Sequence, residues 1–97
     1  MLNNNQKRQL KTLGAKLTNK YQVGKNGLTP TLLDMLEKAI VAHELIKIDV
    51  MKAVDTPVME VALDLSSSLN ADVVSVVGRT ILLFKINKDN NKIKLVK

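Results

Sequence analysis

One short segment of the chain carries the residue types needed to hold a phosphate group. It consists of Gly24, Lys25, Asn26 and Gly27. Glycines at both ends let the backbone turn sharply and let a ligand come close, and the lysine supplies positive charge between them. Thr29 and Pro30 follow, a pairing typical of a helix start, so free N–H groups at residues 29–32 should face the loop. The segment therefore predicts a cradle for a backbone phosphate.

Other interpretations of this loop stay open. As a nucleotide fingerprint it is poor, because it lacks the third glycine of the dinucleotide motif and the spacing of a Walker loop. KH domains clamp a nucleic-acid backbone with a GXXG loop, but theirs joins two helices, whereas this one is predicted to join a strand to a helix. A plain turn between two elements is the remaining alternative.

Residues for catalysis or metal binding are sparse. His43 is the single histidine and there is no cysteine, so a transition-metal site or a nucleophile–base pair lacks partners. The serines at 66–68 have no G-x-S-x-G setting, and the acidic residues lack the spacing of a calcium loop. We expect no enzyme activity, no metal, no cofactor and no small-molecule substrate.

Charge is segregated along the 97 residues, whose net charge is +6. Residues 1–25 hold six basic side chains and no acid: Lys7, Arg8, Lys11, Lys16, Lys20 and Lys25. Residues 73–97 hold six more beside Asp89: Arg79, Lys85, Lys88, Lys92, Lys94 and Lys97. The middle carries three lysines against eight acids. Basic ends around an acidic middle predict an anionic partner, most simply nucleic acid, although solvated lysine tails are the alternative.

The elements that must position these residues follow from periodicity. Leucines at 10, 13 and 17 form one face of a first helix that is otherwise basic. Thr29 and Pro30 begin a second helix of about four turns. Residues 45–51 alternate as a strand, and residues 55–57 repeat the pattern of a capping residue followed by proline, which predicts a third helix from there to the serines. Two β-branched runs joined at Gly78 predict a hairpin.

The predicted order is α-β-α-β-α-β-β in a single domain. Two strand–helix–strand units and a hairpin favour a four-stranded mixed sheet with three helices, an α+β or mixed α/β fold. The core should span about residues 5–86, followed by a polar, basic tail at 87–97. Ile93 and Leu95 could attach the end of this tail to the core. No apolar run is long enough for a membrane span and the N-terminus is polar, so we expect a cytoplasmic protein. We also expect it to be a monomer.

Three motifs together resemble the CRM domain (chloroplast RNA splicing and ribosome maturation). They are VGKNGLT at 23–29, HELIKI at 43–48 and VVGRTILLFK at 76–85. The likeness runs from about Leu10 to Lys85, and the length is similar to that of the stand-alone, bacterial YhbY-like members. The family often has Tyr-Arg where this chain has Phe84-Lys85.

The resemblance implies a fold related to the C-terminal domain of translation initiation factor three. It also implies RNA binding through the GxxG loop and adjoining basic surface, and association with ribosomal RNA in precursors of the large ribosomal subunit. The predicted RNA-binding residues are Gly24, Lys25, Asn26, Gly27, Lys7, Arg8, Lys11, Lys20, Arg79 and Lys85. Because Tyr21 and Phe84 are the only aromatic residues, binding should rest on phosphates and RNA shape rather than base stacking.

A second function class remains possible from the sequence. The acidic stretches Asp34–Glu44 and Glu60–Asp64 could dock a basic protein, with the lysines serving only for solubility. The chain would then be a protein-interaction adaptor.

Overall fold

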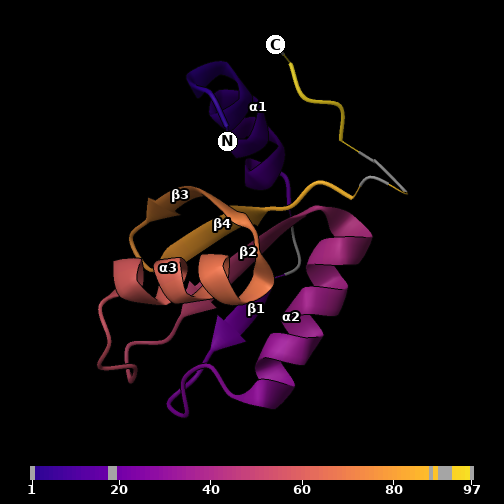
Figure 1. Cartoon of the computed structure of the whole chain (residues 1–97). Coiled ribbons are helices and arrows are strands. Elements are labelled where there is room, and N and C mark those ends of the chain that lie inside the picture. The colour runs from indigo at the N-terminus through magenta and orange to yellow at the C-terminus, as the bar shows by residue number, and fades with distance from the viewer. Residues whose placement is uncertain (1, 18–19, 88, 90–92, 97) are drawn as a thin grey trace.

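The computed structural model describes residues 2–17, 20–87, 89 and 93–96, with Lys20 described by its backbone. Three helices and four strands follow one another in the predicted order (Figure 1). Their bounds are α1 (Asn4–Ala15), β1 (Lys20–Val23), α2 (Pro30–His43), β2 (Leu45–Val50), α3 (Val58–Leu69), β3 (Asp72–Val77) and β4 (Thr80–Phe84). The predicted fold class is confirmed.

The start of α2 is as predicted. The Oγ1 atom of Thr29 accepts a hydrogen bond from the N–H of Leu32 at 3.2 Å, and Pro30 occupies the first helical position. The prediction for α3 was wrong by one residue. Pro57 is itself the N-cap, because its carbonyl accepts the first helical bond from the N–H of Val61 at 3.1 Å, and no side chain caps this helix.

The sheet has the strand order β1-β2-β4-β3. Strand β1 pairs with β2 in parallel, whereas β4 runs antiparallel to both β2 and β3. The C-terminal ends of β1, β2 and β3 therefore meet at one edge of the sheet, which we call the loop edge. Residues 24–27 follow β1 there, and the hairpin turn of β3 and β4 lies at the same edge, with Gly78 at φ +59°.

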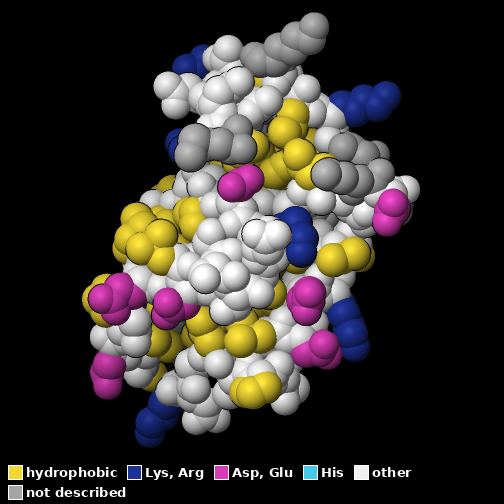
Figure 2. Space-filling model, in the orientation of Figure 1, with side chains coloured by type: hydrophobic (Ala, Val, Ile, Leu, Met, Phe, Trp, Pro, Cys, Tyr) yellow, Lys and Arg dark blue, Asp and Glu magenta, His cyan; other side chains and the backbone are white. Residues whose placement is uncertain are grey.

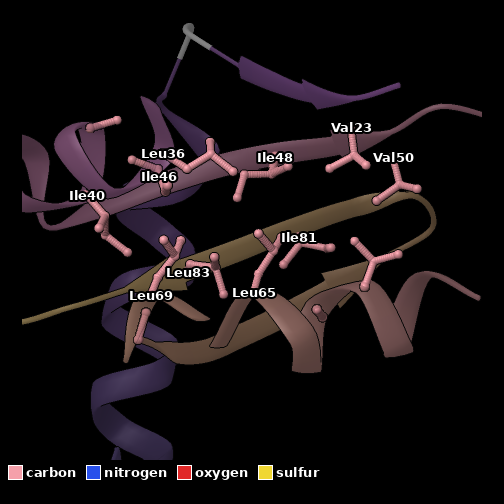
Figure 3. Packing of buried hydrophobic residues seen from close by; sticks show 14 residues of the cluster. Val23, Leu36, Ile40, Ile46, Ile48, Val50, Leu65, Leu69, Ile81 and Leu83 are labelled. Carbon is pink, nitrogen blue, oxygen red and sulfur yellow. The ribbon is translucent and has the colours of Figure 1, made fainter. Parts of the chain in front are cut away.

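Both faces of the sheet are covered. Helices α2 and α3 pack on one face, where Ile48 and Ile81 from the central strands meet Leu36 and Leu65 from the helices (Figure 3). Helix α1 lies across the sheet from them (Figure 1) and forms a second cluster. The buried members of that cluster are Leu10, Leu45, Val74, Leu82 and Phe84.

Helix α1 lies very close to β4 because of a glycine. A Cβ atom built on Gly14 would lie 2.7 Å from Cδ2 and 2.9 Å from Cδ1 of Leu82. Leu82 is itself buried, so its two methyl groups cannot both move away. The missing side chain therefore sets how near α1 approaches the sheet.

The C-terminal segment is attached to the body through a buried carboxylate. Glu44 is fully buried, and its two carboxylate oxygens accept hydrogen bonds from the backbone N–H groups of Asn87 and Ile93, each at 2.8 Å. The side chain of Gln9 on α1 bonds the Lys94 carbonyl at 2.8 Å and the Val96 N–H at 2.9 Å. Residues 93–96 thus lie beside α1, where Ile93 and Leu95 pack against the second cluster.

Replacement of Gly14 by alanine should destabilise the protein even though alanine favours helix. The added methyl overpacks Leu82, at a cost of about 1–3 kcal/mol, against a propensity gain of at most about 1 kcal/mol. In a Leu82→Val background, which removes both Cδ atoms, Gly14→Ala should become neutral or stabilising. Urea unfolding of the four proteins of this cycle measures the effect, and an equal cost in both backgrounds would contradict the contact.

Replacement of Glu44 by glutamine should loosen the C-terminal segment. The amide group has one oxygen in place of two, so one of the N–H groups of Asn87 and Ile93 loses its acceptor, at a cost of about 1–3 kcal/mol. Amide hydrogen exchange should rise first at residues 93–96. Exchange rates there equal to those of the unmodified protein would show that the bonds to Gln9 and the apolar contacts hold the segment without Glu44.

Candidate nucleic-acid interface

The loop at residues 24–27 is a tight turn with its charged tip in solvent. The N–H of Gly27 donates to the Gly24 carbonyl at 2.9 Å, and Lys25 and Asn26 are exposed. Gly27 has φ +72°, a conformation that favours glycine, whereas a Cβ on Gly24 would make only an ordinary contact, 3.7 Å from the Met51 sulfur. The turn thus needs one of its two glycines for its backbone shape.

The start of α2 offers fewer free N–H groups than predicted. The N–H of Thr29 donates to the Gly27 carbonyl at 3.2 Å, that of Leu32 is taken by the Thr29 hydroxyl, and Pro30 has none. Among residues 29–32 of the described structure, Thr31 is therefore the one whose backbone N–H has no hydrogen-bond acceptor in the turn or the helix cap. The N–H groups at the start of α2 are thus largely used by hydrogen bonds within the turn and the cap. A phosphate bound here would rely more on Lys25 than on the helix.

Arg79 lies at the loop edge, but its guanidinium group is hydrogen-bonded to backbone carbonyls of the same chain. Its Nε donates to the Val50 carbonyl at 2.7 Å and its Nη2 to the Met51 carbonyl at 2.6 Å. Met51 in turn donates its N–H to the Val23 carbonyl at 3.0 Å, directly before the loop. The guanidinium therefore ties the hairpin to the end of β2 and so helps place the loop.

Lys85 and Lys20 lie at the opposite edge of the sheet. Lys85 follows the last residue of β4, and its Nζ donates to the Leu69 carbonyl at the end of α3, at 3.1 Å. Lys20 is the first residue of β1. The structure thus does not bring these two residues next to residues 24–27.

The basic residues of α1 occupy the other side of the sheet from α2 and α3. Arg8 and Lys11 are exposed and Lys7 is half-buried. Lys11 shares a hollow with Lys47 of β2, which is not among the predicted RNA-binding residues. The available signal was a lysine inside the alternating strand pattern, but only the packing of α1 onto the sheet brings the two lysines to one place.

Four of the acidic side chains lie on the α2–α3 face. Asp34, Glu37, Glu60 and Asp64 are exposed there, with Asp34 paired to Lys38 at 3.2 Å. Figure 2 shows acidic side chains on this side of the molecule with apolar ones between them. The expectation that Glu44 belongs to this surface was wrong, since its carboxylate is buried under the C-terminal segment.

Two further features of the described residues bear on function. No group of three or more histidine, cysteine or acidic residues among them is placed to hold a metal ion. None of the helices in this part of the chain combines the length and apolar character needed to cross a bilayer. His43 is exposed at the end of α2.

Comparison with known proteins identifies the family. The family model of the CRS1 / YhbY (CRM) domain matches residues 2–85. The probable RNA-binding protein YqeI of Bacillus subtilis is 35% identical over 95 residues, covering 98% of this chain and 99% of the relative. The probable RNA-binding protein PA4753 of Pseudomonas aeruginosa is 33% identical over 91 residues, covering 94% and 88%.

A solved structure has the same fold. The solution structure of SAV1595 from Staphylococcus aureus superposes with a TM-score of 0.82 at 29% identity, covering 99% of this chain and 100% of that one. The match in sequence and the match in fold both extend over nearly the whole chain, as the three motifs led us to expect. The chain belongs to the CRS1 / YhbY (CRM) domain family.

Proposed function

We propose that this protein is a non-catalytic, monomeric RNA-binding protein of the cytoplasm that takes part in assembly of the large ribosomal subunit. The observation that carries the RNA-binding part is the exposed Lys25 at the tip of the turn formed by Gly24 and Gly27. Family membership and the names of the two bacterial relatives support the same class of partner. The ribosomal part rests on the resemblance of the motifs to the family alone.

The mode of binding follows from which side chains are accessible. Phe84 is fully buried, and Tyr21 is half-buried against the main core, so these two residues do not form an exposed stacking platform. The accessible groups are instead Lys25 at the loop edge and Arg8 and Lys11 on α1. Lysine contacts with phosphates release counterions, so affinity should fall steeply with salt and depend little on sequence.

Charge reversal in the loop gives the direct test. Lys25→Ala should remove one phosphate contact and lower the slope of log K against log salt by about one. Lys25→Asp should weaken binding further, because it places negative charge where the phosphate lies. Fluorescence anisotropy at two salt concentrations measures both. The melting temperature should hardly change, since surface substitutions usually alter stability by less than about 0.5 kcal/mol.

The matched control is Lys38→Asp, the same charge change on the α2–α3 face. It should retain RNA affinity close to that of the unmodified protein. Full affinity of Lys25→Asp at low salt would show that the loop is only a turn. A larger loss from Lys38→Asp than from Lys25→Asp would place the RNA on the acidic face and contradict the proposal.

The ribosomal assignment has its own experiment. Ultraviolet crosslinking in cells, followed by sequencing of the attached RNA, should recover mainly large-subunit ribosomal RNA, and the protein should sediment with precursor particles in sucrose gradients. Lys25→Asp should reduce both signals. Crosslinks spread over messenger RNA, with no sedimentation beside ribosomal particles, would remove the ribosomal part and leave RNA binding in place.

A further inference from the structure

A hollow of about 360 Å³ lies between α1 and the adjacent face of β2, β3 and β4. We call it the α1 groove. Six of the residues that shape it are Lys11, Ala15, Lys47, Ser75, Val77 and Leu82. They come from four separate elements, and Gly14, which packs closely against Leu82, also lines the groove. Its volume is at the lower end of the range of ligand pockets, so it suits one small group.

The groove combines positive charge with apolar surface. Within the described part of the chain, the ammonium groups of Lys11 and Lys47 form no hydrogen bond or ion pair. The carboxylate of Asp49, two residues after Lys47, is engaged by the Thr80 hydroxyl at 2.7 Å. A half-buried lysine can pack its aliphatic stem against the sheet and keep its ammonium group in solvent, so both lysines can meet an anion from outside the protein.

The apolar part of the groove is also unusually open. Val77 exposes 72% of its surface, the largest exposed fraction among the large apolar side chains that the structure describes. Ala15 is exposed on the facing side of α1. Both line the groove, so together they offer apolar surface against which a planar ring could pack.

The groove is continuous with the loop edge. Val77 and Thr80 flank the hairpin turn, at the same edge of the sheet as residues 24–27. Strands β1 and β4 are separated only by β2, which is two strand spacings or roughly 10 Å. A nucleic-acid chain that crosses Lys25 can therefore reach the groove within a few nucleotides.

We propose that the α1 groove binds an unpaired nucleotide of the RNA, with its phosphate at Lys11 and Lys47 and its base between Ala15 and Val77. This inference rests on the proposed function and deepens it. A base inside a duplex is stacked on both faces and cannot enter such a groove, whereas a splayed base of a loop or bulge can. The protein then prefers single-stranded RNA over a duplex of the same length.

Two variants test the groove by separate routes. Lys47→Gln removes the charge, and Ala15→Leu fills the space without changing charge. Each should weaken binding of a mixed-sequence, single-stranded oligonucleotide about threefold or more, and Lys47→Gln should also lower its salt slope by roughly 0.7. Affinity for a blunt duplex of equal length should change less. Should Lys47→Gln fail to fold, Ala15→Leu still tests the proposal, because this alanine is exposed at the end of a helix.

The controls make the same chemical changes on the α2–α3 side. The control variants are Lys38→Gln and Ala42→Leu, at exposed positions of α2. Both should bind the two RNAs as the unmodified protein does. If Lys47→Gln lowers the affinity for single-stranded RNA and for duplex equally, the proposal of an unpaired nucleotide is wrong. Unchanged affinity in both groove variants would also contradict it. If the unmodified protein binds neither RNA, both proposals fail. If only Lys25→Asp weakens binding, the loop proposal stands and the groove proposal alone is wrong.

Discussion

The structure depends on burial of the central strand β4 on both of its faces. Residues 81–84 are all buried, and their side chains alternate between two cores. Ile81 and Leu83 contact the cluster under α2 and α3, whereas Leu82 and Phe84 belong to the cluster under α1. A shift of register by one residue would exchange the two sets, so this strand sets both the position of the hairpin and the contact with α1.

That constraint also separates the two charged surfaces. Because α2 and α3 cover one face and α1 the other, the exposed acids of the two-helix layer are kept away from Lys11 and Lys47 by the thickness of the sheet. The loop edge joins the surfaces. There Arg79 holds the end of β2 through two carbonyl groups, so the charge of this arginine is used first to fix the backbone beside the loop.

The buried carboxylate of Glu44 extends the same organisation to the C-terminal segment. Glu44 ends α2 at φ +62°, and its side chain turns under the chain to accept bonds from Asn87 and Ile93. A buried charge of this kind is costly unless it is fully hydrogen-bonded, and backbone N–H groups supply that here. The exposed Lys94 is consequently held beside α1 rather than free in a tail.

The sequence by itself determined the order of elements, the cap at Thr29 and the turn at Gly78, because periodicity, capping and turn chemistry act over a few neighbouring residues. It also indicated the loop and its lysine. Only the tertiary structure decided that β4 lies between β2 and β3, that Lys85 lies at the sheet edge opposite the loop, and that Lys47 lines the same groove as Lys11. Burial of Glu44 was likewise decided there. These features arise from contacts between residues far apart in the chain, and no local pattern of residue types encodes which distant partner each one meets.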